Sequence, residues 1–205
     1  MIDGVIKYSI EHKTKNTPEF PNYDEIEALR GRLFALGLIG EKDGIGFGNL
    51  SLRAEKEKTF FITATQTGSQ STLLNQHYTY INDYDFSSFK LFSQGLHKPS
   101  SEALSHAMIY EIDPKINAVI HIHSKPLWNY MKDEDAFCTR AEYGTVEMVE
   151  EIATLYKNKN PFKNNIFVMR GHEDGIISFG RDIQEAERVL YKLIQSYLKL
   201  INSSY

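Results

Sequence analysis

The sequence lacks the features of a disulfide-bonded, secreted or membrane-spanning protein. Cys138 is the only cysteine among 205 residues, so neither an internal disulfide nor a cysteine-rich zinc site can form. No run of 18 apolar residues occurs, and residues 1–16 contain no apolar signal core. We therefore expect a cytoplasmic protein that has no membrane partner.

An excess of positive charge is also missing. The formal net charge is −4 and no long run of Lys or Arg occurs, which argues against a nucleic-acid partner. The chain contains no P-loop and no Gly-x-Gly-x-x-Gly after a predicted strand, so nucleotide binding is not indicated. Hydrophobic residues make up 41% of the chain and charged residues 24%, as in ordinary globular proteins. The length suits one domain with a sizeable core.

Four segments have the apolar periodicity of helices. The first begins at Asp24, and Gly40 is its expected end. The last begins with a capping box, in which Asp182 is the cap and Glu185 stands three residues later. The predicted helices cover residues 24–39, 101–110, 145–157 and 183–197.

Short segments rich in β-branched and aromatic residues lie between these helices and predict strands. They cover residues 48–53, 59–63, 78–83, 88–93, 118–123, 165–169 and 175–179. Several neighbours are close enough in sequence to form hairpins, which favours a largely antiparallel sheet covered by helices. Before them, a short extended piece from Val5 to Glu11 is followed by a linker-like stretch, residues 14–23.

Two histidines share one face of the predicted strand 118–123. Successive side chains of a strand point to opposite faces, so His121 and His123 project together while the other face stays apolar. Two imidazoles held in this way are half of a tetrahedral zinc site. Taken alone, however, this pattern fits surface or core histidines better than a metal site.

His172 and Glu102 are further candidate ligands. His172 stands in a turn between two predicted strands, where it is either a ligand or a histidine bonded to its own loop. Glu102 lies in the first turn of a helix, where the helix dipole favours a carboxylate with or without a function. His106, one turn later, can compete as a ligand. Three histidines and an open fourth position are typical of a catalytic zinc.

Three turns that carry Gly or Ser precede the histidine pair, at residues 46–51, 63–69 and 99–102. Backbone N–H groups in turns and at a helix N-terminus, together with hydroxyl groups, can bind a phosphate. Each turn is a weak signal alone, because serines at the start of a helix are commonly structural caps.

In this order, the motifs resemble those of the class II aldolase/adducin-domain family. The matching stretches are GFGNLSLR (46–53), FITATQTG (61–68), KPSSEALSHAMIYEIDPKINAVIHIHS (98–124), YGTVEMVEEI (143–152) and VMRGHEDGIISFG (168–180). The chain is thus expected to be a single domain, 1–205, with residues 1–23 outside the matched region. The resemblance implies a three-layer α/β/α fold around a mixed, mostly antiparallel sheet, and a homotetramer with active sites at subunit interfaces.

The resemblance also assigns residues to the site. His121, His123 and His172 match the family's zinc ligands. Glu102 matches the acidic residue that contacts the metal at rest and acts as the acid/base. The residues that match the pocket for the substrate phosphate are Asn49, Thr67, Gly68, Ser100 and Ser101.

The implied activity is that of a zinc-dependent lyase, with one Zn²⁺ per subunit, that cleaves a small phosphorylated ketose through a metal-stabilised enediolate. Epimerisation or dehydration of a sugar phosphate is the alternative within the family. The alternative outside catalysis is an adducin-like binding or assembly domain, which need not keep the metal ligands. All four candidate metal residues are present, which favours the enzyme.

One segment departs from the family pattern. Aldolases of this family usually have a longer segment after the histidine pair, and it brings a tyrosine into a neighbouring subunit's site. Only residues 124–142 fill that gap here, so no residue can be matched to that tyrosine. Tyr130 and Tyr143 lie nearby in sequence, and each is more simply interpreted as a packing aromatic.

Overall fold

A large mixed sheet forms the centre of the computed structural model, which describes residues 4–132, 138–159 and 164–203. Its strands are β1 (Ser9–Thr14), β4 (Asn49–Arg53), β5 (Phe60–Thr63), β6 (Tyr78–Asp85), β7 (Lys90–Gly95), β8 (Ala118–His123), β9 (Cys138–Thr139), β10 (Ile166–Met169) and β11 (Gly175–Gly180). The order across the sheet is β1-β7-β6-β5-β4-β8-β11-β10-β9. A separate small hairpin joins β2 (Gly40–Lys42) to β3 (Ile45–Phe47).

Neighbouring strands of the sheet are antiparallel except at its two edges. There, β1 is parallel to β7 and β9 is parallel to β10. Each segment predicted as a strand forms one, and β8 has the predicted bounds. The expectation of a mixed, mostly antiparallel sheet is therefore confirmed.

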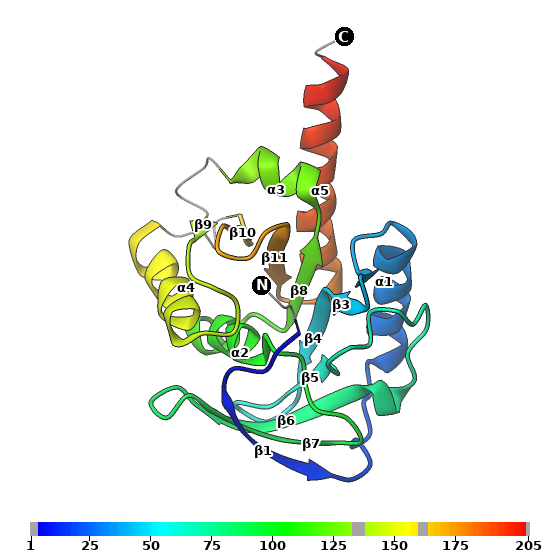
Figure 1. Ribbon diagram of the computed structural model, residues 1–205, viewed down its shortest axis with the longest axis vertical. Helices are drawn as coiled ribbons and strands as arrows, with labels where there is room; N and C mark the ends of the chain where they lie inside the picture. Colours follow the sequence, from blue (N-terminus) through cyan, green and yellow to red (C-terminus); the bar gives the residue numbers. More distant parts are fainter. Residues whose placement is uncertain (1–3, 133–137, 160–163, 204–205) are drawn as a thin grey trace.

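Helices cover both faces of the sheet (Figure 1). They are α1 (Tyr23–Ala35), α2 (Ala103–Ile112), α3 (Lys125–Met131), α4 (Val146–Lys159) and α5 (Ile183–Asn202), with a short 3-10 turn at Asn75–His77. Buried side chains of α1, α3 and α5 pack with one face of the sheet, and those of α2 and α4 pack with the other. Since apolar residues alternate between these two cores along β8, the expected three-layer α/β/α fold is confirmed.

Alternation along β8 places the candidate metal histidines. Ile120 and Ile122 point into the core beneath α1, α3 and α5, and Val119 points into the core beneath α2 and α4. His121 and His123 therefore project on the side of α2, where Glu102 precedes that helix.

The structure corrects the predicted end of the first helix. α1 ends at Ala35 and not at Gly40, because Gly37 has a left-handed backbone (φ 68°) that an L-residue rarely adopts. Gly40 instead begins β2. The extended piece predicted for Val5 to Glu11 forms a strand from Ser9 to Thr14, and the linker-like stretch after it buries Phe20 against Phe61.

The sequence analysis did not predict α3, β9, the β2–β3 hairpin or the 3-10 turn at Asn75–His77. Residues 124–142, which depart from the family pattern, contain α3 and β9. Within them, residues 133–137 lie outside the described part of the chain. In the described ranges, no helix combines the length and the apolar character that crossing a membrane requires.

Candidate metal centre

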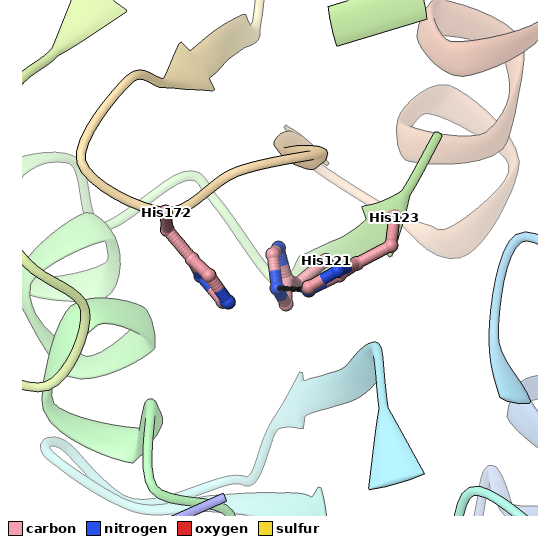
Figure 2. Close-up of side chains that lie close together, drawn as sticks. All are labelled: His121, His123 and His172. Atoms are coloured by element: carbon pink, nitrogen blue, oxygen red, sulfur yellow. Dashed lines mark hydrogen bonds between the residues drawn. The ribbon is translucent and has the colours of Figure 1, made fainter. Parts of the chain in front are cut away.

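Two adjacent strand regions bring three histidines together. His121 and His123 stand on β8, and His172 lies in the turn that connects β10 to β11. That turn is held by backbone hydrogen bonds from the His172 N–H to Met169 and from the Gly175 N–H to His172. Figure 2 shows the three rings converging on one point from these two segments.

The three imidazoles are spaced as metal ligands. One nitrogen from each ring lies within 4.8 Å of the others, and His121 Nε2 is 3.0 Å from His123 Nε2. Nitrogens in a tetrahedral zinc site with bonds of roughly 2.0–2.1 Å are about 3.3 Å apart. Small movements of the rings would therefore create a coordination site, and the set fits a divalent metal.

The second nitrogen of His121 supports the same conclusion. Its Nδ1 lies 3.2 Å from the carbonyl oxygen of Ile176, which can only accept a hydrogen bond. Donation from Nδ1 turns Nε2 toward the other two rings, as is usual for histidines that bind metals. His121 is fully buried, so this orientation is fixed by packing as well.

Glu102 lies directly beside the histidines. Its Oε2 is 3.0 Å from His121 Nε2, and its Oε1 is 3.3 Å from His172 Nδ1. The Asn49 amide donates to Oε2 at 2.8 Å, and Asn49 pairs with His121 between β4 and β8. Burial alone would raise the pKa of the Glu102 carboxyl, but the two histidines outweigh it and hold the pKa well below its ordinary value.

The three turns singled out in the sequence meet beside this cluster. They line one pocket with a volume of about 30 Å³, which we call the turn pocket. Five of its lining residues are those expected to bind phosphate: Asn49, Thr67, Gly68, Ser100 and Ser101. Gly68 has no room for a side chain, because a Cβ there would lie 1.9 Å from the Gly40 carbonyl oxygen.

Local hydrogen bonds hold these turns in place. The Thr67 hydroxyl donates to Ala64 at 2.9 Å, and the Ser100 hydroxyl accepts from the Glu102 N–H at 3.3 Å. Buried Arg30 of α1 donates to the carbonyls of Thr67 (3.2 Å), Ser71 (3.3 Å) and Gln70. These contacts restrict the backbone of the loop that carries Thr67 and Gly68.

A wider cleft opens on the other side of the histidines. It has a volume of about 600 Å³ and is lined by His123, His172 and Phe47 together with charged residues of the β2–β3 hairpin and the 170–174 turn. None of the described residues that line this cleft is one of the five residues expected to bind phosphate. The histidines therefore lie between a narrow polar pocket and an open cleft.

The structure separates the remaining sequence candidates. His106 is not one of the three grouped histidines: it is buried with its Nδ1 2.7 Å from the Ser51 hydroxyl, and burial lowers its pKa to about 3. Tyr130 lies on α3 against Tyr197. Tyr143, in contrast, lines the turn pocket, and its ring centre is 4.8 Å from that of His172.

Sequence reasoning did not assign several other residues at the site, among them Phe47, Gln66 and Gly4. Phe47 lies with its ring centre 5.3 Å from that of His123, and Gln66 and Gly4 line the turn pocket. Phe47 and Gln66 stand inside two of the turns that the sequence analysis selected, so their positions were a usable signal. Gly4 lies far from every motif, and nothing local marks it.

Several known proteins are similar to this chain in sequence. The sequence pattern of the class II aldolase and adducin N-terminal domain matches residues 41–197. An L-fuculose phosphate aldolase of Methanococcus maripaludis is 26% identical over 155 residues, which are 68% of this chain and 75% of that protein. Its counterpart in Methanococcus vannielii is 28% identical over the same shares.

Solved structures share the fold. An L-fuculose 1-phosphate aldolase superposes with a TM-score of 0.66 at 17% identity, covering 92% of this chain and 88% of that one. A sugar-phosphate aldolase from Thermotoga maritima gives a TM-score of 0.61 at 21% identity, covering 88% and 95%. Since the family pattern spans most of the chain and the fold agrees, the protein belongs to the class II aldolase and adducin N-terminal domain family.

Proposed function

We propose that this protein is a zinc-dependent lyase that cleaves a small phosphorylated ketose in an aldolase-type reaction. The observation that carries the proposal is the convergence of three imidazoles and a buried carboxylate beside a polar pocket built from three turns. The names of the similar archaeal proteins indicate L-fuculose phosphate as the first substrate to test. Because members of this family are often oligomers, we also propose that the protein works as a homo-oligomer.

The turn pocket suits the phosphate end of such a substrate. Ser100 and Ser101 precede α2, where backbone N–H groups and the helix dipole favour an anion. Thr67 and Gly68 approach from the opposite turn, and the absence of a side chain at Gly68 lets the backbone come close. Anchoring the phosphate here would direct the carbonyl end of the ketose toward His123 and His172, which line the same pocket.

His121, His123 and His172 would hold the metal. A divalent metal in that position supplies Lewis-acid polarisation of the substrate's carbonyl end. Glu102 would act as the acid/base. It would transfer the proton that the three-carbon fragment takes up after the carbon–carbon bond breaks. Asn49 orients the Glu102 carboxylate through its amide, so that one oxygen is fixed and the other faces His172.

The test is a screen of ketose 1-phosphates, including L-fuculose 1-phosphate, with metal-replete protein and with measurement of released dihydroxyacetone phosphate. We expect turnover by the wild type and a loss of roughly 100-fold or more in Glu102→Gln, the usual contribution of an acid/base group. Glu150→Gln changes an exposed carboxylate of α4 and should keep full activity. A fully active Glu102→Gln protein would remove Glu102 as the proton carrier.

Metal analysis separates the enzyme from a non-catalytic binding domain. We expect close to one equivalent of zinc per chain after expression with sufficient metal. Less than about half an equivalent would contradict the metal centre. A full equivalent without cleavage of any ketose phosphate would instead reject aldol cleavage and leave epimerisation or dehydration, which NMR of the sugar products distinguishes.

A further inference from the structure

The N-terminal segment reaches the turn pocket with Gly4, although it lies outside the part of the chain that the family pattern matches. From β1 at the sheet edge, the dark blue trace in Figure 1 runs back toward the middle of the molecule. Gly4 at its beginning lines the turn pocket, and we call residues 4–7 the strap. Tyr8, the next residue, is buried and packs in the core beneath α2 and α4.

A few contacts near Tyr143 hold the strap. Lys7 Nζ lies 2.6 Å from Glu142 Oε1, donates to the Tyr143 carbonyl at 3.0 Å, and sits 3.8 Å from the centre of the Tyr143 ring. The Val5 N–H donates to the Tyr143 hydroxyl at 3.3 Å. Val5 is about half exposed, and Gly4 and Lys7 are only partly buried. Partly buried Ile6 packs against the core beneath α2 and α4 and gives the strap its apolar contact, so the apolar burial of the strap is limited.

Tyr8 anchors the strap at its other end. Its hydroxyl donates to the Ser100 carbonyl at 2.7 Å in a buried position. Burial raises the pKa of this hydroxyl well above its ordinary value, so it remains a donor at all physiological pH. After Tyr8, β1 pairs with β7 along its whole length. Residues 4–7 can therefore move while the chain from Tyr8 onward stays fixed.

Gly4 lies directly against the Gln66 side chain. A Cβ at residue 4 would lie 2.1 Å from Gln66 Nε2, and Gly4 also has a left-handed backbone (φ 79°). The same Gln66 amide accepts a hydrogen bond from the Gly46 N–H at 3.0 Å through Oε1. The Gln66 amide oxygen thus binds the Gly46 N–H, which is a backbone donor of the turn pocket. The contact with Gly4 keeps the Gln66 amide in this position.

The closed strap leaves too little room for a sugar phosphate. The turn pocket has about 30 Å³, enough for two or three water molecules at roughly 10–15 Å³ each. Pockets for small ligands are roughly 300–1,000 Å³. The open cleft beyond His123 and His172 is large enough, but the five candidate phosphate residues do not line it. A ligand that reaches those turns must displace part of the pocket's wall.

We propose that the strap is a gate of the turn pocket: residues 4–7 must swing away from Gln66 and Tyr143 before a phosphorylated ligand can reach the three turns. The inference rests on the proposed function for the identity of the ligand. The gate itself depends only on the contacts of the strap. The strap is held by the partly exposed contacts of Lys7 and Val5 and by the packing of partly buried Ile6, so few contacts must break for it to open.

Hydrogen exchange of the turns tests the gate without any ligand or activity. Peptides covering residues 44–50 and 64–70 are followed by mass spectrometry in the full-length wild type, in Lys7→Ala and in Gly4→Ala. We expect exchange roughly fivefold faster in Lys7→Ala, the effect of losing one partly exposed ion pair and one cation–π contact. Gly4→Ala should also accelerate exchange, because the added methyl group pushes the flexible Gln66 amide away from the Gly46 N–H that it binds.

Two control variants isolate the strap. Lys13→Ala removes an exposed lysine of β1 and should exchange like the wild type. Gly37→Ala imposes a similar left-handed strain (φ 68°) with no atom near its added methyl group, so it reproduces the backbone penalty alone. Unchanged exchange in both Lys7→Ala and Gly4→Ala would overturn the gate. The gate would also be overturned if Gly37→Ala accelerated hydrogen exchange of the turns as much as Gly4→Ala does.

A binding experiment then separates the gate from the proposed function. Dihydroxyacetone phosphate is mixed with metal-loaded wild type and with a chain lacking residues 2–7, and the association rate is measured. A faster association in the shortened chain supports both proposals, and equal rates contradict the gate. If neither protein binds the probe, the proposed substrate class fails, and the exchange rates alone decide on the gate.

Discussion

At the scale of single residues, His121 has the two contacts that a metal ligand requires. One ring nitrogen faces the Ile176 carbonyl and the other faces His123 and Glu102. The strand fixes the backbone, the carbonyl fixes the ring, and burial excludes water from the remaining nitrogen. His123 and His172 complete the set from positions closer to the two cavities.

Replacing a candidate ligand should remove the metal. We expect His121→Ala and His172→Ala to lose bound zinc, because two imidazoles alone leave a tetrahedral site half filled. Metal content of the purified variants is measured by plasma mass spectrometry. His97→Ala changes an exposed histidine and should retain the wild-type amount. Wild-type metal content in either ligand variant would reject that ligand.

Some residues of the site could be predicted from the sequence and others could not, for a physical reason. The pair on β8 follows from the two-residue period of a strand, which is encoded locally. The place of Tyr143 and Gly4 depends on contacts between segments more than 130 residues apart, such as the bond from Val5 to Tyr143. No local pattern records such contacts, so the sequence indicated a packing role for Tyr143 and nothing for Gly4.

At the scale of elements, α1 supports the turn pocket from behind. Arg30 is almost fully buried and donates to three carbonyls of the loop that follows β5. Its partner Glu27 lies 3.6 Å away and accepts from the Leu73 N–H and the Tyr78 hydroxyl, each at 2.7 Å. A helix outside the pocket thus determines which backbone groups of the loop can face a ligand.

Arg30→Met should therefore harm both stability and binding. We expect the free energy of unfolding to fall by about 3 kcal/mol, because Glu27 and three carbonyls lose a buried partner. KM for the phosphorylated substrate should rise more than kcat falls, since the loop and not the metal is disturbed. Urea denaturation and steady-state kinetics measure the two effects.

Arg32→Met is the matched control on the same helix. Arg32 is half exposed and pairs with Glu187 at 2.7 Å, so its loss should cost less than about 1 kcal/mol. A destabilisation as large as that of Arg30→Met, or an equal rise in KM, would contradict the special role of Arg30.

The capping residue of α5 was predicted and makes the expected bond. The Asp182 carboxylate accepts from the Glu185 N–H at 2.7 Å, whereas the Glu185 carboxylate reaches the Arg181 N–H, one residue before the cap. Asp182→Ala should lower the free energy of unfolding by about 1 kcal/mol. Urea denaturation checks this, with Gln184→Ala as a neutral control. An equal stability of Asp182→Ala and wild type would show that the cap contributes nothing.

Elements with a strong local period were predictable, and those without one were not. α5 repeats apolar residues at helical spacing, and β8 is rich in β-branched residues with two histidines on one face, so their existence followed from the sequence. α3 is only seven residues long, and β9 is two residues that pair with β10. Both depend on partners in the folded molecule, such as the Met169 carbonyl that accepts from the Trp128 side chain.

At the scale of the whole molecule, the candidate metal ligands connect β8 to the turn between β10 and β11. A metal that binds only the folded chain stabilises it by about 4 kcal/mol at a thousandfold excess over its Kd. We expect a chelator to lower the melting temperature of the wild type and to leave that of His172→Ala unchanged. Scanning calorimetry measures both. The same shift in the two proteins would assign the effect to another site.

The parallel pairing of β1 with β7 has a consequence for the behaviour of the protein in solution. Without residues 9–14, β7 would become an edge strand with its backbone N–H and C=O groups open to other chains. β1 presents exposed Glu11 and Lys13 at that edge, and charges there oppose pairing between sheets. We expect a chain shortened to begin at residue 15 to form aggregates larger than the oligomer of the intact chain, as light scattering would detect. The N-terminal strand would then protect the sheet from aggregation.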